Sequence, residues 1–251
     1  MPTVVAMYSF IFIMGLILGN FVNRCIDRFP KKIDLRKKSF CESCNANISW
    51  HDEIPIVSFL LLKGRCRSCG AKVNIQYPIV ELANGALYVI VFMANGCNLQ
   101  SAIYCLMTSA FLVISIIDER TQEIPLPCNL FLGVLGVILC VFQFPGIKEL
   151  LARLIGAVVI FAVLFLLAQF GLMGGGDVKL MAIITLLLGW PKVTIAFFLA
   201  CIIGSVIHVI RMKVSKADHV LAMGPYLCLA LWICTFWGDQ MISWYLGQLI
   251  K

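Results

Sequence analysis

Residues 82–117 read LANGALYVIVFMANGCNLQSAIYCLMTSAFLVISII and contain no charged side chain. An apolar run of about 18 residues without charge is long enough to cross a lipid bilayer as a helix. This run is long enough for two such helices, and we expect the turn between them near Asn95–Gln100. The stretch therefore predicts a pair of consecutive membrane-spanning helices and sets the fold class.

Similar runs occupy much of the remaining chain, at residues 1–23, 124–147, 154–176, 193–210 and 219–238. A shorter run, 180–191, covers only about half to two-thirds of a bilayer, so it must extend into its flanks or form a broken helix. Composition agrees, with 61% hydrophobic and 13% charged residues, against roughly half and a quarter in soluble domains. We predict an all-α polytopic membrane protein with about eight transmembrane helices. Whether the sixth is a full span stays open.

Basic residues concentrate between the first two predicted helices. Eleven of the 20 Lys and Arg residues lie in 24–72, which predicts a cytoplasmic loop and an N-terminus on the opposite side of the membrane. The net charge of +7 needs no nucleic acid, because a basic loop can lie against anionic lipid head groups. The chain divides into three predicted parts: a first transmembrane helix (1–23), a cytoplasmic four-cysteine domain (24–77) and a membrane-embedded bundle (78–251).

The four-cysteine domain is too small for a generous apolar core, which makes it a candidate for stabilisation by a metal. It contains Cys41-x2-Cys44 and, after 21 residues, Cys66-x2-Cys69. Paired C-x2-C motifs at about this separation are typical of a closed, structural zinc site. We predict a small zinc-ribbon-like domain, with two disulfides or a redox pair as alternatives. The other eight cysteines stand singly in or beside apolar runs and are expected to be packing residues.

Two aspartates stand at the ends of predicted membrane helices, where burying a charge is costly. Asp118 ends the third predicted helix, and Asp177 follows Gly174, Gly175 and Gly176 between the fifth and sixth predicted helices. Alternating crossings put both on the cytoplasmic side. Two carboxylates that share one proton can hydrolyse a peptide bond, because the ionised one activates water while the neutral one hydrogen-bonds the carbonyl oxygen. The glycines would let a peptide backbone approach closely.

Other interpretations of these acidic residues stay open. Asp118 can be a boundary residue paired with Arg120, and Asp177 can be a helix N-cap that binds the amides of 178–180. Both can be proton relays of a proton- or metal-coupled transporter with a zinc-sensing domain, or belong to a non-catalytic assembly factor. Glu81, beside Pro78 at the start of the second helix, can cap that helix or contact a substrate amine.

Several motifs follow one another along the chain: GNFVNRCIDRFP at 19–30, the four cysteines, YPIVEL at 77–82, Asp118 with Pro125 seven residues on, GGGDVK at 174–179 and MGP at 223–225. This series resembles the type IV prepilin peptidases, which are leader peptidases and N-methyltransferases of pilus assembly and type II secretion.

The resemblance implies that Asp118 and Asp177 are the catalytic pair of a GxGD-type intramembrane aspartyl protease. Substrate-binding residues would include the three glycines, Lys179 and Glu81, and the cysteines would hold zinc. The substrates would be prepilins or pseudopilins, cut after a glycine at the cytoplasmic face of the bacterial inner membrane, with the N-terminus of the enzyme periplasmic. The new N-terminal residue would then be methylated with S-adenosylmethionine. No glycine-rich strand–turn–helix pattern independently indicates a fold for that methyl donor, so methyl transfer is expected from the resemblance alone.

Overall fold

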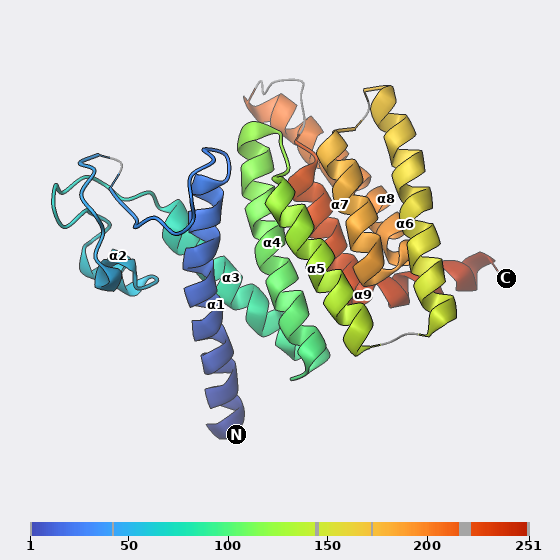
Figure 1. Cartoon of the computed structure of the whole chain (residues 1–251), viewed down its shortest axis with the longest axis horizontal. Helices are drawn as coiled ribbons and strands as arrows, with labels where there is room; N and C mark the ends of the chain where they lie inside the picture. The colour runs from blue at the N-terminus through green and yellow to red at the C-terminus, as the bar shows by residue number, and fades with distance from the viewer. Residues whose placement is uncertain (1, 42, 144–145, 172, 216–221, 250–251) are drawn as a thin grey trace. The chain divides into compact units, whose positions relative to one another are not determined.

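The structure of the protein is a computed structural model that describes residues 2–41, 43–143, 146–171, 173–215 and 222–249. These residues form helices and loops, with two isolated β-bridges in place of strands. The longer helices are α1 (Pro2–Arg28), α3 (Gln76–Asn95), α4 (Leu99–Thr121), α5 (Leu126–Phe142), α6 (Ile147–Gln169), α7 (Gly175–Leu188), α8 (Trp190–Ser215) and α9 (Gly224–Leu249) (Figure 1). Helices α1, α3, α4, α6 and α8 are long and apolar enough to cross a membrane. The chain is therefore an all-α, multi-pass membrane protein, as the sequence predicts.

The helix boundaries follow most of the uncharged runs. The turn expected near Asn95–Gln100 lies at Gly96, between α3 and α4. Helix α6 begins at Ile147, seven residues before its uncharged run. Charged residues can continue a helix when they pair within it, and here Arg153 and Glu149 form an ion pair of 2.7 Å one turn apart. The first residues of the run 219–238 lie outside the described part of the chain.

Helix α7 is the short sixth helix expected from the sequence. It extends toward its N-terminal flank to Gly175 and ends at Leu188, before Gly189 with φ 83°. Its 14 residues span about 21 Å, less than the roughly 30 Å of a hydrocarbon core. Helix α7 contacts α5, α6, α8 and α9, and the side chain of Arg153 donates hydrogen bonds to the Leu186 and Leu187 carbonyls at its C-terminal end. A helix enclosed in this way does not need to reach both bilayer surfaces.

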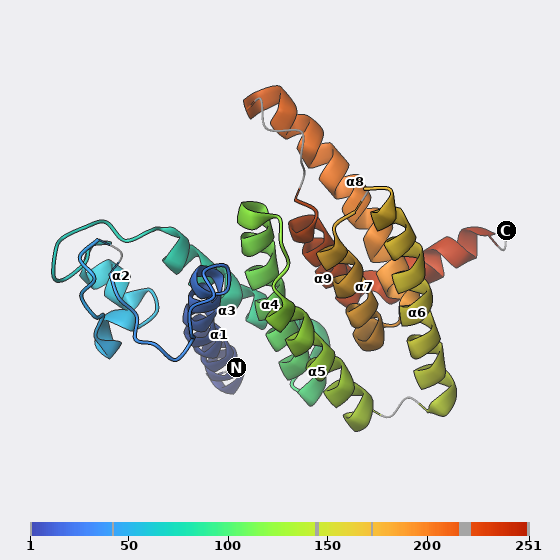
Figure 2. The same cartoon turned by 45° about the horizontal axis from the view of Figure 1, so that its top comes forward.

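The chain forms two compact units, Met1–Val113 and Ile114–Lys251, so that α4 contributes to both. In the second unit α7 lies between α5 and α6, and α8 packs along α9 (Figures 1 and 2). Most of α6 is exposed, with only Gly156 and Leu164 buried, as expected of a helix that faces lipid. The division into three parts made from the sequence stays a prediction.

In the first unit, α1 and α3 pack antiparallel through small residues. A Cβ atom built on Gly15 would lie 2.6 Å from Gly85 Cα, and one on Gly19 would lie 2.7 Å from Glu81 Cα. Such close backbone approach is typical of small-xxx-small helix pairs in membranes. Asn84 is fully buried at this contact and donates a hydrogen bond of 2.7 Å to the Gly15 carbonyl. The glycines therefore allow the backbones of the two helices to approach closely.

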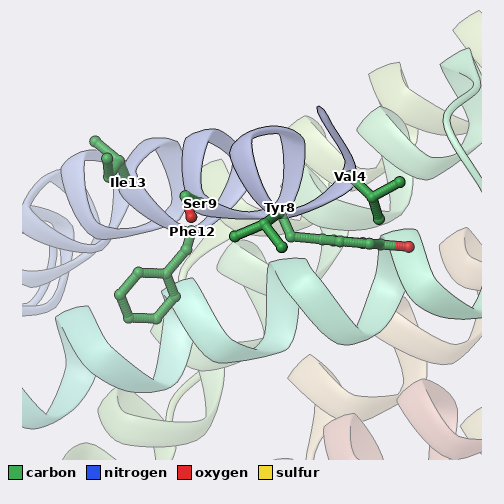
Figure 3. A pocket seen from close by; sticks show the side chains of 6 residues that line it. Val4, Tyr8, Ser9, Phe12 and Ile13 are labelled. Atoms are coloured by element: carbon green, nitrogen blue, oxygen red, sulfur yellow. The ribbon is translucent and has the colours of Figure 1, made fainter. Parts of the chain in front are cut away.

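A shallow apolar depression lies along the N-terminal half of α1, where the Phe12 ring also packs close to Gly85 of α3. Its lining comes from α1 alone and consists of Val4, Val5, Tyr8, Ser9, Phe12 and Ile13 (Figure 3). Val4, Val5 and Ile13 are exposed, and apolar side chains that stay exposed on a membrane-spanning helix are covered by lipid. We therefore assign this depression to the lipid-facing surface.

Loops and the short helices η1 (Trp50–Glu53) and α2 (Val57–Leu61) connect α1 to α3. They lie at the C-terminal end of α1 and the N-terminal end of α3 (Figure 1). The Arg28 guanidinium anchors them, since it is buried and donates hydrogen bonds to the carbonyls of Asp34, Leu35 and Lys37. The four-cysteine segment is thus tied directly to the end of a membrane helix.

Candidate active site and metal centre

The last turn of α4 buries the first predicted catalytic residue. The Asp118 side chain is only 4% exposed, and its Oδ2 accepts a hydrogen bond of 2.8 Å from the backbone N–H of Gly224. Gly224 is the first residue of α9, and the N–H groups of a first helical turn have no partner within their helix. They also favour a nearby negative charge. Asp118 is therefore held by the start of another helix and is not a solvated boundary residue.

The first turn of α7 buries the second. Asp177 is the third residue of α7 and 7% exposed, while Gly174 is the N-cap. The interpretation of Asp177 as an N-cap is therefore wrong: the backbone N–H of Gly174 donates to the Asp177 carboxylate from the preceding turn. Oδ1 of Asp177 is buried and has no hydrogen-bond partner among the described residues. Asp118 lies close enough to act electrostatically on Asp177, so the two carboxylates form one site although 59 positions separate them.

The three glycines before Asp177 have different surroundings. A Cβ atom on Gly174 would lie 3.1 Å from Asp177 Oδ2, and one on Gly176 would lie 3.0 Å from the Cβ of Ile124. A Cβ atom on Gly175 would meet nothing within 4 Å. Gly174 and Gly175 are exposed. Two of the glycines are thus closely packed against side chains of the protein itself, and Gly175 leaves open space beside the site.

Two residues of α9 were not predicted as parts of this site. Gly224 appeared only within a motif of the family resemblance, and Cys228 was expected to be a packing residue. Cys228 is buried, shares a hydrogen bond with the side chain of Ser115, and lies within electrostatic range of both aspartates. The Gly-Pro pair at 224–225 could have indicated a helix start, but no local pattern tells which side chain that start meets.

The remaining predicted substrate residues lie elsewhere. Lys179 is exposed on α7, and residues two positions apart on a helix do not face each other, so its side chain points away from that of Asp177. Glu81 belongs to the first unit, where its Oε2 accepts a hydrogen bond of 2.8 Å from the backbone N–H of Ile56. Roles of Lys179 and Glu81 in substrate binding stay predictions.

The four cysteines of residues 24–77 come together in one cluster. The Sγ atoms of Cys41, Cys44, Cys66 and Cys69 all lie within 4.8 Å of one another, and those of Cys41 and Cys69 are 3.9 Å apart. Sulfurs around a tetrahedral zinc ion lie about 3.8 Å apart, given Zn–S bonds of about 2.3 Å. All four are free thiols, which disagrees with the disulfide alternative. The cluster is able to hold a zinc ion.

Two matching backbone turns build this cluster. In the first, the Cys41 N–H donates to Ala46 O at 2.9 Å, and in the second the Cys66 N–H donates to Ala71 O at 2.8 Å. Each turn passes through a left-handed residue, at Asn45 with φ 54° and at Gly70 with φ 73°, as asparagine and glycine readily allow. The two turns thus present their thiols in the same way.

The backbone around the cluster favours a thiolate at Cys41. Hydrogen bonds from the backbone N–H groups of Cys44 and Ser43 lower the pKa of the Cys41 thiol to about 6. Nearby, Arg67 makes three hydrogen bonds of 2.6–3.1 Å to the Asp52 carboxylate and thereby lowers the pKa of Asp52. Metal-binding cysteines must be deprotonated, so the backbone prepares Cys41 to bind a cation.

Comparison with known proteins gives matches in both units. A family model described as the bacterial peptidase A24 N-terminal domain matches residues 13–95, and one described as the type IV leader peptidase family matches residues 105–209. A relative from Aeromonas salmonicida is 30% identical, with 97% of this chain and 95% of the relative covered. The chain belongs to the type IV leader peptidase family. The resemblance inferred from the sequence is therefore confirmed.

Further members of the family cover nearly the whole chain. A relative from Pseudomonas aeruginosa is 32% identical over 93% of this chain and 91% of the relative. One from Bacillus subtilis is 29% identical over 96% and 98%. These relatives carry the name prepilin leader peptidase/N-methyltransferase, which favours the peptidase over the transporter. No solved structure matches the chain significantly.

The two matched segments of this family member separate its two candidate sites. The four cysteines and Glu81 lie within residues 13–95, and the two aspartates lie within residues 105–209. Gly224 lies beyond both segments, so neither family match reaches the residue that binds Asp118. The contact between them was visible only in the structure.

Proposed function

We propose that this protein is a membrane-embedded aspartyl endopeptidase that removes the basic leader of type IV prepilins or pseudopilins after a glycine, and that it N-methylates the new N-terminal residue. The observation that carries the proposal is the burial of two nearby carboxylates, with Asp118 bound to the first residue of α9 and Asp177 in the first turn of α7. Membership of a family whose relatives are named prepilin leader peptidase/N-methyltransferase gives the substrate class.

In the peptidase reaction, the two aspartates divide the proton transfers. Asp118, which accepts the Gly224 N–H, is the ionised partner and takes a proton from water as the water attacks the scissile carbonyl carbon. Asp177 carries the shared proton on its unpartnered Oδ1 and donates it to the carbonyl oxygen. When the tetrahedral intermediate collapses, the proton held by Asp118 passes to the leaving amine, and Asp177 regains a proton from the hydroxyl that becomes the new carbonyl. The exposed backbone at Gly174 and Gly175 provides room for the extended peptide.

The methyltransferase half requires S-adenosylmethionine, which would supply the methyl group. We assign the zinc ion a structural role, with Cys41, Cys44, Cys66 and Cys69 as its ligands, because four thiolates leave no open coordination position. Neither group takes part in the hydrolytic steps above.

We infer that the four-cysteine domain and the aspartate pair face the cytoplasm, with the N-terminus in the periplasm and the chain in the bacterial inner membrane. The eleven basic residues within 24–72 support this orientation. The Asp118 and Asp177 ends of α4 and α7 would then meet a leader that has not crossed the membrane. The lipid bilayer and the prepilin are the partners in this proposal, and no nucleic acid is involved.

Mass spectrometry of a prepilin N-terminus tests both activities at once. The purified protein is incubated with prepilin and S-adenosylmethionine, and the product is compared with an incubation without the methyl donor. We expect loss of the leader in both samples and an added methyl group only in the first. An uncut prepilin in both samples would contradict the proposal.

A further inference from the structure

A cavity of about 450 Å³, lined by both apolar and polar groups, lies in the first unit, where α1 and α3 reach the four-cysteine domain. Asn23 of α1, Phe59 of the connecting segment and Glu81 of α3 are among the residues that line it. Pockets for cofactor-sized ligands have volumes of about 300–1,000 Å³. The hydrolytic site described above uses none of these residues.

Two buried side chains that line this cavity, Asn23 and Glu81, are incompletely paired. Asn23 is 3% exposed; its Nδ2 donates to the Tyr77 carbonyl at 3.0 Å, but its Oδ1 is buried with no hydrogen-bond partner among the described residues. Glu81 is 6% exposed and accepts the Ile56 N–H, yet no ion pair within the described part of the chain balances its charge. A buried carboxylate without a cation is costly.

The helix contact brings these acceptors to the same place. Gly19 packs against Glu81, as described above, and Asn23, one turn further along α1, binds Tyr77, one turn before Glu81 on α3. Successive turns of two antiparallel helices therefore present both acceptors. Phe59 adds an aromatic surface to the lining.

The other acidic side chains that line the cavity already have partners. The Arg24 guanidinium pairs with the Glu53 carboxylate, and the Tyr77 hydroxyl donates to Asp27 Oδ2 at 2.7 Å. The Glu81 carboxylate and the Asn23 amide oxygen can therefore be paired by a positively charged group that carries several N–H donors. A primary ammonium group has this chemistry.

We propose that Glu81 and Asn23 bind the primary ammonium group of a ligand in the methyl-transfer reaction. This inference rests on the methyltransferase half of the proposed function. Two ligands of that reaction carry such a group: the amino-acid end of the methyl donor and the new N-terminus of the cleaved pilin. The site takes one of them, and the two sources are separated by experiment.

Binding to the full-length protein in detergent micelles tests the site, with Glu81→Gln as the main variant. Glutamine retains an oxygen for the Ile56 N–H, whose residue holds an unusual φ of 60°, and removes only the charge. S-adenosylhomocysteine is compared with 5′-methylthioadenosine, which lacks the amino-acid end. A peptide that begins with a free Phe amine is compared with its N-acetylated form. Asp239→Asn, at an exposed ion pair of the second unit, is the matched control.

We expect Glu81→Gln to weaken at least one amine-bearing probe tenfold or more and to leave its amine-free counterpart unchanged. A loss for S-adenosylhomocysteine identifies the donor, and a loss for the peptide identifies the acceptor. Glu81→Asp, which keeps the charge, should bind that probe more tightly than Glu81→Gln and covers the case in which the glutamine variant does not fold. No amine-selective loss would overturn the site. Prepilin cleavage by the wild type, measured in parallel, tests the proposed function independently.

Discussion

Gly224 brings a backbone N–H against Asp118 and leaves no room for a side chain there. A Cβ atom at this position would lie 2.6 Å from Asp118 Oδ2, which is shorter than any non-bonded contact of that kind. Gly224 is therefore a positioning residue for the carboxylate that we propose to be catalytic. Glycine is needed at this position because a methyl group would occupy the space next to the carboxylate, and the backbone flexibility of glycine is less important here.

Gly224→Ala should lower kcat/KM for prepilin cleavage at least tenfold, because displacing a reacting group by about 1 Å can cost about 100-fold. The rate is measured with purified protein at matched concentration. Gly247→Ala on the same helix is the control, since its Cβ would meet nothing within 4 Å. An unchanged rate in Gly224→Ala would show that the contact with Asp118 has no role in hydrolysis.

At the scale of helices, the α1–α3 pair depends on the absence of side chains. Gly15→Ala would place a Cβ 2.6 Å from Gly85 Cα, and such overpacking usually costs about 1–3 kcal/mol. We expect a lower thermal midpoint for the first unit, measured by unfolding in detergent. Ile17→Val, at an exposed position of α1, should change stability by less than about 0.5 kcal/mol. Equal thermal midpoints for both variants would show that the close contact between Gly15 and Gly85 does not contribute to stability.

The paired cysteine turns predict a metal-dependent element. Purified protein should contain about one zinc ion per chain, and changing any of Cys41, Cys44, Cys66 or Cys69 to Ser should remove it, because a structural site needs all four thiolates. Elemental analysis by mass spectrometry measures the content. Cys97→Ser is the control, since Cys97 is exposed and lies outside the cluster. Purified protein that contains no metal, has four free thiols and keeps an ordered loop would contradict the zinc site.

The sequence predicted most helices, because uncharged runs of sufficient length have few alternatives in a membrane. It also predicted that 180–191 would need residues from its flanks, and α7 took them from the N-terminal side. The start of α6 was displaced because Glu149 and Arg153 satisfy each other within the helix. Charge alone therefore marks a helix end poorly.

The candidate site was predictable as far as its chemistry is local. Two isolated aspartates at helix ends and four paired cysteines stand out in any apolar chain. The contact of Gly224 with Asp118 joins residues 106 positions apart, and the buried Oδ1 of Asn23 depends on how α1 meets α3. Such features arise from tertiary packing, for which a single sequence has no local pattern.

At the scale of the whole molecule, the two matched segments suggest a division of labour. Cys41→Ser combined with Cys44→Ser should depress methylation of the mature N-terminus more than cleavage, because the aspartate pair is built from α4, α7 and α9. Both products are quantified on one prepilin by mass spectrometry. Equal losses of the two activities would show that the four-cysteine domain is part of the proteolytic site.

The central claim is that Asp118 and Asp177 together carry out hydrolysis. The most direct measurement is the mass of a prepilin N-terminus after incubation with Asp118→Asn or Asp177→Asn, each verified as folded. Asparagine keeps the size of the side chain but cannot exchange the required proton, and general acid–base groups contribute about 10²–10⁴-fold. We predict that neither variant removes the leader at more than about a hundredth of the wild-type rate, whereas Asp239→Asn does so normally. Substantial cleavage by Asp177→Asn would contradict the assignment, and cleavage by Asp118→Asn would move the search to Glu119 or Glu123.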